Sequence, residues 1–262
     1  MSELEFRGVS VRYGHGRAAH VAVDGVDLTV RGGTTHGLVG ESGSGKSTMA
    51  RVAVGLTPVS AGTVLLDGVP LTDRTRAARL ARRRVQMIFQ DPLSALDPRM
   101  PVGTSVAEGL LATGRTFARL DREARVSELL QRVRIDPARA GEPPAAFSGG
   151  QRQRITIARA LAAEPTVLIA DEITSALDVS VQGAVLNVLR ELQRDLDLTV
   201  LFISHNLAVV RYMSDEVSVM RDGHVVEHGD TDAVLADPAD PYTRELLRSV
   251  PVLGEPLELE DA

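Results

Sequence analysis

The sequence predicts an α/β fold in which helices cover both faces of a parallel sheet. Two short apolar runs, at 166–170 and 198–204, have the length and composition of buried strands. Helical patterns over 149–163 and 179–194 precede these two runs along the chain. Because strands that alternate with helices build parallel sheets, this order predicts the fold class. The 262 residues suffice for one large domain or two smaller lobes.

The N-terminal part predicts strands of a different kind. Apolar and polar residues alternate over 4–11 and 26–30, which is typical of half-buried antiparallel strands. Short apolar stretches at 63–66 and 85–89 are further strand candidates. We therefore expect residues 1–90 to contain an antiparallel β subdomain and the first part of the parallel core.

The stretch from Asp91 to Gly150 has a helical character. Proline and glycine interrupt it, and residues 121–134 carry apolar side chains at helical spacing. We expect a helical subdomain over 91–150, the second part of the core over 151–230, and a C-terminal extension over 231–262. The end of that extension, from Gly254, holds four acidic residues and no basic one, which predicts a solvated tail.

The composition excludes several classes of protein. The chain has no cysteine, which excludes disulfides, thiolate zinc sites, iron–sulfur clusters and a cysteine nucleophile. No apolar run approaches the ~20 residues that a membrane span needs. A net charge of −6 argues against binding to nucleic acid through bulk charge. The first residues have neither the basic nor the apolar segment of a secretory signal, so we expect a cytosolic chain.

A glycine-rich loop predicts a phosphate-binding site. Residues 40–47 read G-E-S-G-S-G-K-S and fit the pattern G-x4-G-K-[ST] between a strand and a helix. Its glycines allow backbone amides to point at phosphate oxygens, and the helix adds its positive end. Lys46, the only lysine of the chain, would reach the β/γ-phosphates, and the Ser47 hydroxyl would hold Mg²⁺. The predicted binding residues are Gly40, Glu41, Ser42, Gly43, Ser44, Gly45, Lys46, Ser47 and Thr48.

Carboxylates follow one of the predicted buried strands. Asp171 and Glu172 stand at its carboxyl end, which in this architecture lies beside the phosphate loop. Asp171 suits a Mg²⁺ ligand, and Glu172 would orient and polarise the attacking water. His205 follows the next buried strand and is a candidate γ-phosphate sensor. Taken singly, each of these signals also fits a solvated turn or a structural histidine.

Two further residues carry weaker signals. Gln90 ends a predicted strand, where its amide could contact Mg²⁺ or water. Tyr13 lies just after the first strand, and its ring fits either the core or a stack on a nucleotide base.

The motif F-S-G-G-Q-R-Q-R at 147–154 resembles the signature motif of the ATP-binding subunits of ABC transporters. With the phosphate loop and the acidic pair, the resemblance covers nearly the whole chain. It implies an ABC-type ATPase of the P-loop NTPase class, with a RecA-like parallel core, an antiparallel β subdomain and an inserted helical subdomain. It also implies ATP and Mg²⁺ as ligands.

The resemblance also implies roles for individual residues. Tyr13 matches the aromatic residue that stacks on adenine, and Gln90 matches the residue that senses Mg²⁺ and contacts the membrane partner. His205 matches the switch histidine, and Ser175 to Asp178 match the loop that crosses the dimer. The residues that would contact the ATP of a second subunit are Ser148, Gly149, Gly150 and Gln151.

Two stretches are similar to the oligopeptide/dipeptide/nickel importer group within that family, namely 90–103 and 237–251. Three residues depart from the usual pattern. Ile173 replaces a proline, Asn206 an aspartate and Asp240 a histidine. Longer relatives carry a cysteine-ligated iron–sulfur cluster, which we do not expect in a chain without cysteine.

The resemblance implies a set of partners. We expect a second ABC ATPase subunit, identical or related, two transmembrane permease subunits and, indirectly, an extracytoplasmic solute-binding protein. The chain would lie at the cytoplasmic face of the membrane, without nucleic acid as a partner.

Three alternatives remain open from the sequence. A soluble ABC ATPase acting on nucleic acid or ribosomes could use the arginine-rich stretch 74–84, which also fits an exposed helix face. An ABC exporter subunit is the second alternative. A P-loop kinase or GTPase is the third, and the motifs at 148–151 and 175–178 argue against it.

Overall fold

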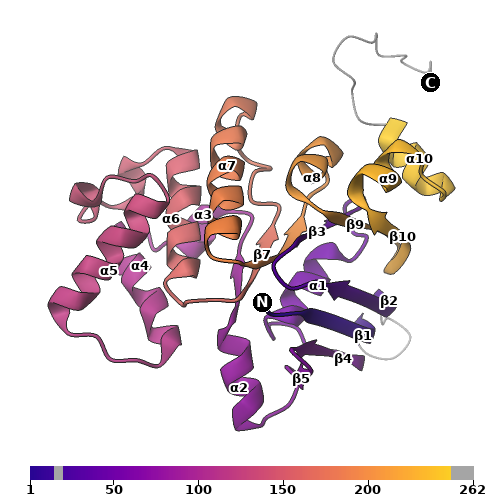
Figure 1. Ribbon diagram of the computed structural model, residues 1–262, viewed down its shortest axis with the longest axis horizontal. Helices are drawn as coiled ribbons and strands as arrows, with labels where there is room; N and C mark the ends of the chain where they lie inside the picture. The colour runs from indigo at the N-terminus through magenta and orange to yellow at the C-terminus, as the bar shows by residue number, and fades with distance from the viewer. Residues whose placement is uncertain (15–19, 249–262) are drawn as a thin grey trace.

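The computed structural model describes residues 1–14 and 20–248, so the expected acidic tail from Gly254 lies outside the described residues. Its strands form a four-stranded sheet in the order β2-β1-β4-β5 and a six-stranded sheet in the order β10-β9-β3-β8-β7-β6 (Figure 1). The first sheet consists of β1 (Leu4–Tyr13), β2 (His20–Val30), β4 (Ala61–Leu66) and β5 (Val69–Pro70). The second consists of β3 (Thr35–Val39), β6 (Val85–Ile88), β7 (Val167–Asp171), β8 (Thr199–Ile203), β9 (Glu216–Arg221) and β10 (His224–Asp230).

The helices flank these sheets. They are α1 (Lys46–Ala53), α2 (Arg76–Arg83), α3 (Pro92–Ala95), α4 (Val102–Gly109), α5 (Arg119–Arg132), α6 (Gly149–Leu161), α7 (Val179–Asp195), α8 (Leu207–Met213), α9 (Thr231–Ala236) and α10 (Pro241–Arg248), with short 3-10 turns η2 (Leu110–Thr113), η3 (Pro137–Arg139) and η4 (Pro144–Ala146). No helix in the described part of the chain is both long and apolar enough to cross a membrane.

The six-stranded sheet confirms the predicted parallel core. Strands β6, β7, β8, β3 and β9 pair in parallel, and β10 joins β9 antiparallel. All residues of β3, β7 and β8 are buried, as the apolar runs predicted. Since parallel strands end at the same edge of a sheet, the loops that follow β3, β7 and β8 meet there.

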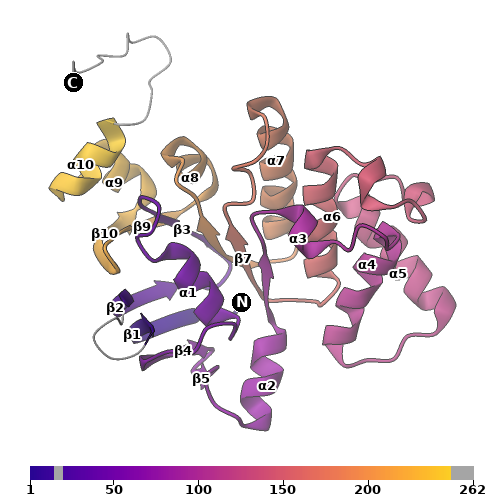
Figure 2. The ribbon, with the colours of Figure 1, turned by 180° about the vertical axis from the view of Figure 1, so that it is seen from behind.

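The two faces of this sheet belong to two apolar clusters. Val167 and Ile169 of β7 pack in a cluster with α1 and the antiparallel sheet. Leu168 and Ala170 point the other way, into a cluster with α4, α5, α6 and α7. The alternation follows from the two-residue period of a strand. Figure 2 shows the same arrangement, with the antiparallel sheet on one side and α3 to α6 on the other.

Two helices end earlier than the sequence pattern predicted. We expected helices to reach residues 134 and 163, whereas α5 ends at Arg132 and α6 at Leu161. Arg134 and Glu164, just beyond, have φ angles of 58° and 53°, which an α-helix cannot contain. Glycine usually takes this conformation after a helix, and because neither position holds a glycine, no local pattern marks these helix ends.

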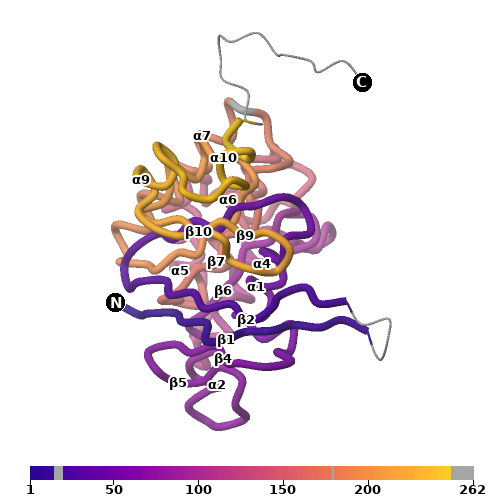
Figure 3. The backbone as a smooth tube through the Cα atoms, turned by 90° about the vertical axis from the view of Figure 1, so that its right-hand side faces the viewer, coloured from indigo at the N-terminus to yellow at the C-terminus, as the bar shows by residue number. Residues whose placement is uncertain are grey.

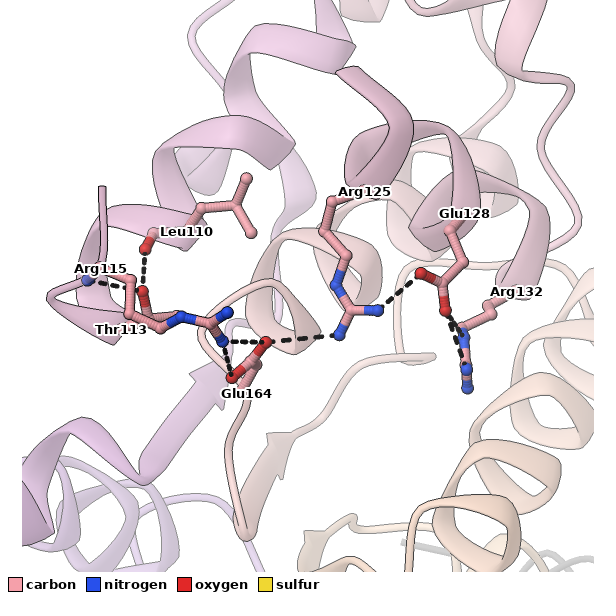
Figure 4. A network of polar contacts seen from close by, with 7 residues as sticks. All are labelled: Leu110, Thr113, Arg115, Arg125, Glu128, Arg132 and Glu164. Carbon is pink, nitrogen blue, oxygen red and sulfur yellow. Dashed lines mark hydrogen bonds and ion pairs between the residues drawn. The ribbon is translucent and has the colours of Figure 1, made fainter. Parts of the chain in front are cut away.

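A polar network ties α5 to the turn that follows α6 (Figure 4). The guanidinium of Arg125 lies 2.6 Å from the Glu128 carboxylate and 3.5 Å from that of Glu164. Arg132 also contacts Glu128, at 3.0 Å, and Arg115 contacts Glu164, at 3.4 Å. The hydrogen bond from Arg125 holds the pKa of Glu128 below its usual value. Such exposed pairs contribute little individually, about 0–1 kcal/mol each, so the apolar cluster determines the packing here.

The arginine-rich stretch 74–84 contains α2, beside the antiparallel sheet. Arg82 donates hydrogen bonds to the carbonyls of Leu71 and Asp73. Arg84 contacts the Asp67 carboxylate at 2.9 Å. These two arginines therefore connect α2 and its end to the neighbouring sheet.

Helices α4 and α6 approach each other closely at Gly109. A Cβ atom there would lie 2.2 Å from the Arg159 carbonyl oxygen of α6. Gly183 in α7 offers a contrast, since a Cβ there would have no atom within 4 Å.

We expect Gly109→Ala to lower the free energy of unfolding by roughly 1–3 kcal/mol, because the new methyl group forces two packed helices apart. Gly183→Ala is the matched control. It should raise the free energy of unfolding by up to about 1 kcal/mol, because alanine favours a helix over glycine. Urea denaturation of both variants measures the difference, and a Gly109→Ala protein as stable as the parent contradicts the close approach.

Candidate nucleotide-binding site

The loop between β3 and α1 has a backbone that glycine makes possible. Gly40 and Gly45 have φ angles of 148° and 108°. A Cβ atom at Gly40 would lie 2.1 Å from the Met220 carbonyl oxygen, and one at Gly45 would lie 2.5 Å from that of Ala22. Strands β9 and β2 thus press against the loop at two places where no side chain fits. At Gly43 the space is open, and its φ of 85° alone favours glycine.

Lys46 is buried inside this loop. Its Nζ donates hydrogen bonds to the carbonyls of Gly40 at 2.7 Å and Glu41 at 2.6 Å, and to the Ser44 hydroxyl at 3.2 Å. Burial lowers the pKa of Lys46, while the negative charges of Glu172 and Asp171 oppose the shift. The loop therefore holds a compact ammonium group at its centre.

Next to the lysine, Ser47 meets the end of β7. Its Oγ donates a hydrogen bond of 3.1 Å to Asp171 Oδ1. Burial raises the pKa of Asp171, and the hydrogen bond from Ser47 opposes that shift. A hydroxyl and a carboxylate are oxygen ligands of the type that Mg²⁺ prefers.

The same oxygen atoms do not form a complete metal cage. Across residues 1–14 and 20–248, no group of three or more His, Asp or Glu side chains could hold a metal ion. Mg²⁺ usually keeps several waters and binds through one or two carboxylates together with substrate phosphates, a mode for which Ser47 and Asp171 supply suitable oxygens.

Glu172 stands at the centre of a polar cluster beyond β7. Gln90 Nε2 lies 3.2 Å from its Oε2 and 3.1 Å from Ser175 Oγ. His205 Nδ1 lies 3.5 Å from the same Glu172 oxygen. Glu172 has a φ of 48°, a conformation that is uncommon for a residue with a side chain. Its amide donates a 3.0 Å hydrogen bond to the Ile203 carbonyl, which holds this turn against β8.

Part of the phosphate loop, Gln90 and Glu172 line a cavity of about 390 Å³, while Asp171 and His205 are not among its lining residues in the described part of the chain. It is lined by Tyr13, His20, Ala22, Ser42, Gly43, Gly45, Lys46, Ser47, Thr48, Gln90 and Glu172. The sequence did not single out His20 and Ala22 of β2. The pairing of β1 with β2 would have predicted their place in the cavity wall, because His20 lies directly opposite Tyr13 in this antiparallel pair.

The predicted signature residues lie elsewhere. Within the described part of the chain, none of residues 148–151 lines this cavity. They open α6, where the Gln151 amide donates to Ser148 Oγ at 3.3 Å and the Ser148 amide to Gln151 Oε1 at 2.9 Å. A Cβ at Gly150 would lie 2.2 Å from Val181 Cγ1, so this glycine also allows α6 to pack on α7. Asp178 stands at the start of α7, and its carbonyl accepts from the Val181 amide at 2.9 Å.

Comparison with known proteins shows the family to which the chain is related. Residues 23–175 match the ABC transporter family, and residues 226–262 match the C-terminal region of oligopeptide/dipeptide transporters. A protein of Brucella abortus is 51% identical over 238 residues, which are 90% of this chain and 71% of that one. The oligopeptide transport ATP-binding protein OppF of Salmonella typhimurium is 47% identical over 238 residues, again 90% and 71% of the two chains.

Solved structures show the same fold. The dimeric structure of MJ0796, a bacterial ABC transporter cassette, has a TM-score of 0.78 and 28% identity, over 87% of this chain and 98% of that one. The structure of cbiO1 from Clostridium perfringens has a TM-score of 0.79 and 29% identity, over 89% and 90%.

The chain therefore belongs to the ABC transporter family, as an ATP-binding cassette with the ATPase fold. Its C-terminal part is of the oligopeptide/dipeptide transporter type. The resemblance that the sequence motifs suggested is confirmed both for the ABC transporter family and for the oligopeptide/dipeptide group within it.

Lys46→Ala should weaken the binding of Mg-ATP by about 10- to 100-fold, because a charge-assisted contact to the phosphates is lost. Lys46→Arg should also weaken it, because a planar guanidinium cannot occupy the position of an ammonium 2.6 to 2.7 Å from two carbonyl oxygens. Isothermal titration calorimetry measures both. Unchanged nucleotide affinity in the alanine variant contradicts the assignment of this loop to phosphate binding.

Proposed function

We propose that the chain hydrolyses ATP to power a membrane importer of dipeptides or oligopeptides. The observation that carries the proposal is the meeting of Gln90, Glu172 and His205 beside the Lys46 loop. The names of relatives such as OppF and the match over 226–262 support peptides as the cargo, rather than the nickel that the sequence also allowed.

Different residues of the site have different roles in ATP binding and hydrolysis. Lys46 and the amides of its loop bind the β- and γ-phosphates, while the Tyr13 ring stacks on adenine. Ser47, Asp171 and Gln90 supply the oxygen ligands for Mg²⁺, which when bound neutralises phosphate charge. Phosphoryl transfer to water needs mainly positioning and charge stabilisation.

Glu172 is proposed as the group that orients the attacking water. Its Oε2 faces both Gln90 Nε2 and His205 Nδ1, which fixes the direction of the carboxylate. His205, with a side chain 58% exposed, can turn from Glu172 toward a γ-phosphate.

A single chain supplies half of each catalytic site. Residues 148–151 lie outside the cavity of their own chain, so we propose that they cover the ATP bound to a second cassette. The amides of Gly149 and Gly150 at the start of α6, together with the helix dipole, suit the γ-phosphate. Ser175 and Asp178 would lie at the same interface. The dimeric structure of the similar cassette MJ0796 supports the pairing of two cassettes.

Closure of such a dimer around ATP, and its reopening after hydrolysis, would switch two permease subunits between inward- and outward-facing states. We propose that the second cassette is a related or identical chain and that the assembly sits on the cytoplasmic face of the membrane. A solute-binding protein outside would deliver the peptide.

Glu172→Gln should retain ATP binding but reduce turnover by about 10²- to 10⁴-fold, because an amide cannot accept a proton from water. The control is Glu164→Gln, which makes the same chemical change in an exposed ion-pair network away from the cavity. Phosphate release by the assembled transporter measures both variants. Parental turnover in the Glu172 variant contradicts its role.

Tagged purification from membranes in mild detergent tests the transporter itself. We expect two multi-span permeases to co-purify, and ATP-dependent uptake of a labelled peptide by vesicles that contain the complex and its binding protein. Recovery with ribosomes or nucleic acid instead would overturn the proposal of an importer, while the proposed ATP hydrolysis would still stand. Nickel uptake without peptide uptake would overturn the proposal that the cargo is a peptide.

A further inference from the structure

A side chain from the C-terminal segment contacts the phosphate loop. The Glu41 amide donates a 3.1 Å hydrogen bond to the Tyr242 hydroxyl of α10, across 201 positions of sequence. Tyr242 is only 4% exposed, and the Arg221 guanidinium lies 4.8 Å from the centre of its ring. Figure 3 shows α9 and α10 beside β9 and β10, at the edge of the parallel sheet.

The contact acts on one particular peptide unit. The Glu41 amide and the Gly40 carbonyl belong to the same planar peptide group. The carbonyl end accepts the 2.7 Å hydrogen bond from Lys46 Nζ, and the amide end donates to Tyr242. A rotation of this peptide would break both hydrogen bonds together, so Tyr242 stabilises the orientation in which Gly40 holds Lys46.

Tyr242 is itself held in place by a series of contacts from β10. The Glu227 carboxylate accepts hydrogen bonds from the amides of Ala239 at 2.7 Å and Asp240 at 3.2 Å. Asp240 Oδ1 then accepts from the Tyr242 amide at 2.8 Å. Asp240 thus caps the start of α10. Its carboxylate fixes the backbone from which the tyrosine ring extends.

The surroundings keep the hydroxyl in the form that this contact needs. Burial raises the pKa of Tyr242, so its hydroxyl stays neutral at physiological pH. The outer side of the loop is also held at Ser44, whose carbonyl accepts a 3.1 Å hydrogen bond from the Gly223 amide. The turn between β9 and β10 and the helix α10 together form an outer support for the loop.

We propose that Tyr242 is a positioning residue for ATP binding: through the Glu41 amide, the C-terminal segment holds the phosphate loop in the conformation that receives the nucleotide. This inference rests on the proposed function of the Lys46 loop. According to this proposal, the segment 237–248 takes part in ATP binding, a role that the phosphate-loop motif alone does not predict.

Tyr242→Phe removes the hydroxyl and keeps the buried ring. We expect Mg-ATP to bind about 2- to 10-fold more weakly, the effect of losing one neutral hydrogen bond, with a matching rise in KM and an unchanged kcat. Amides of the loop at 40–45 should exchange hydrogen faster in the nucleotide-free protein, with exchange elsewhere unchanged. Calorimetry, steady-state phosphate release by the assembled transporter and hydrogen exchange measure these effects.

Coupling between two sites is reciprocal. Bound ATP should therefore slow hydrogen exchange in α10 of the parent chain, and less so in Tyr242→Phe. The matched control is Tyr212→Phe, which removes a hydroxyl bonded to Asn187 at the contact of α7 and α8. It should behave like the parent in ATP binding and in loop exchange.

Parental ATP affinity and parental loop exchange in Tyr242→Phe would overturn the inference. So would faster exchange throughout the chain, or an equal fall in kcat, since either marks a general loss of structure. A parent chain that does not bind ATP would instead overturn the proposed function. The two failures are therefore distinguishable.

Discussion

The structure depends on the close packing of the phosphate loop against its neighbours. At Gly40 and Gly45 the carbonyls of β9 and β2 occupy the space where a side chain would begin. This contact curls the loop around Lys46, so that two carbonyls and a hydroxyl hold one buried ammonium group. Because β3 lies between β8 and β9 in the sheet, the loop also opens toward the ends of the neighbouring strands. The positions of Lys46, Asp171 and Glu172 follow from this arrangement.

The register of the parallel sheet brings the remaining groups together. Asp171 pairs with Ile203 across β7 and β8, so the residues that follow each strand leave the sheet at the same level. Glu172 then turns through a left-handed backbone conformation, and its carboxylate meets Gln90 and His205. Three separate segments thus contribute to one cluster. The predicted signature residues 148–151 lie at the start of α6, where Gly150 allows α6 and α7 to pack closely.

The C-terminal segment carries both a family match and a long-range contact. Its match to oligopeptide/dipeptide transporters classifies the chain, and its buried tyrosine reaches the loop common to many nucleotide-binding proteins. This contact links the C-terminal segment to the phosphate loop across 201 positions of sequence. The carboxylate of Asp240 caps α10 directly, and this fixes the backbone from which Tyr242 extends.

The sequence by itself determined the fold class, the strands β3, β7 and β8, and the motif residues around Lys46, Asp171 and Glu172. These features are encoded locally, in apolar periodicity, in glycine spacing and in residues at strand ends, so a short window of sequence contains them. Only the tertiary structure revealed the contact of Tyr242 with Glu41, the place of His20 and Ala22 in the cavity wall, and the close approach at Gly109. Each of these depends on two segments far apart in the chain. Their contact is decided by packing and register, which no local pattern specifies.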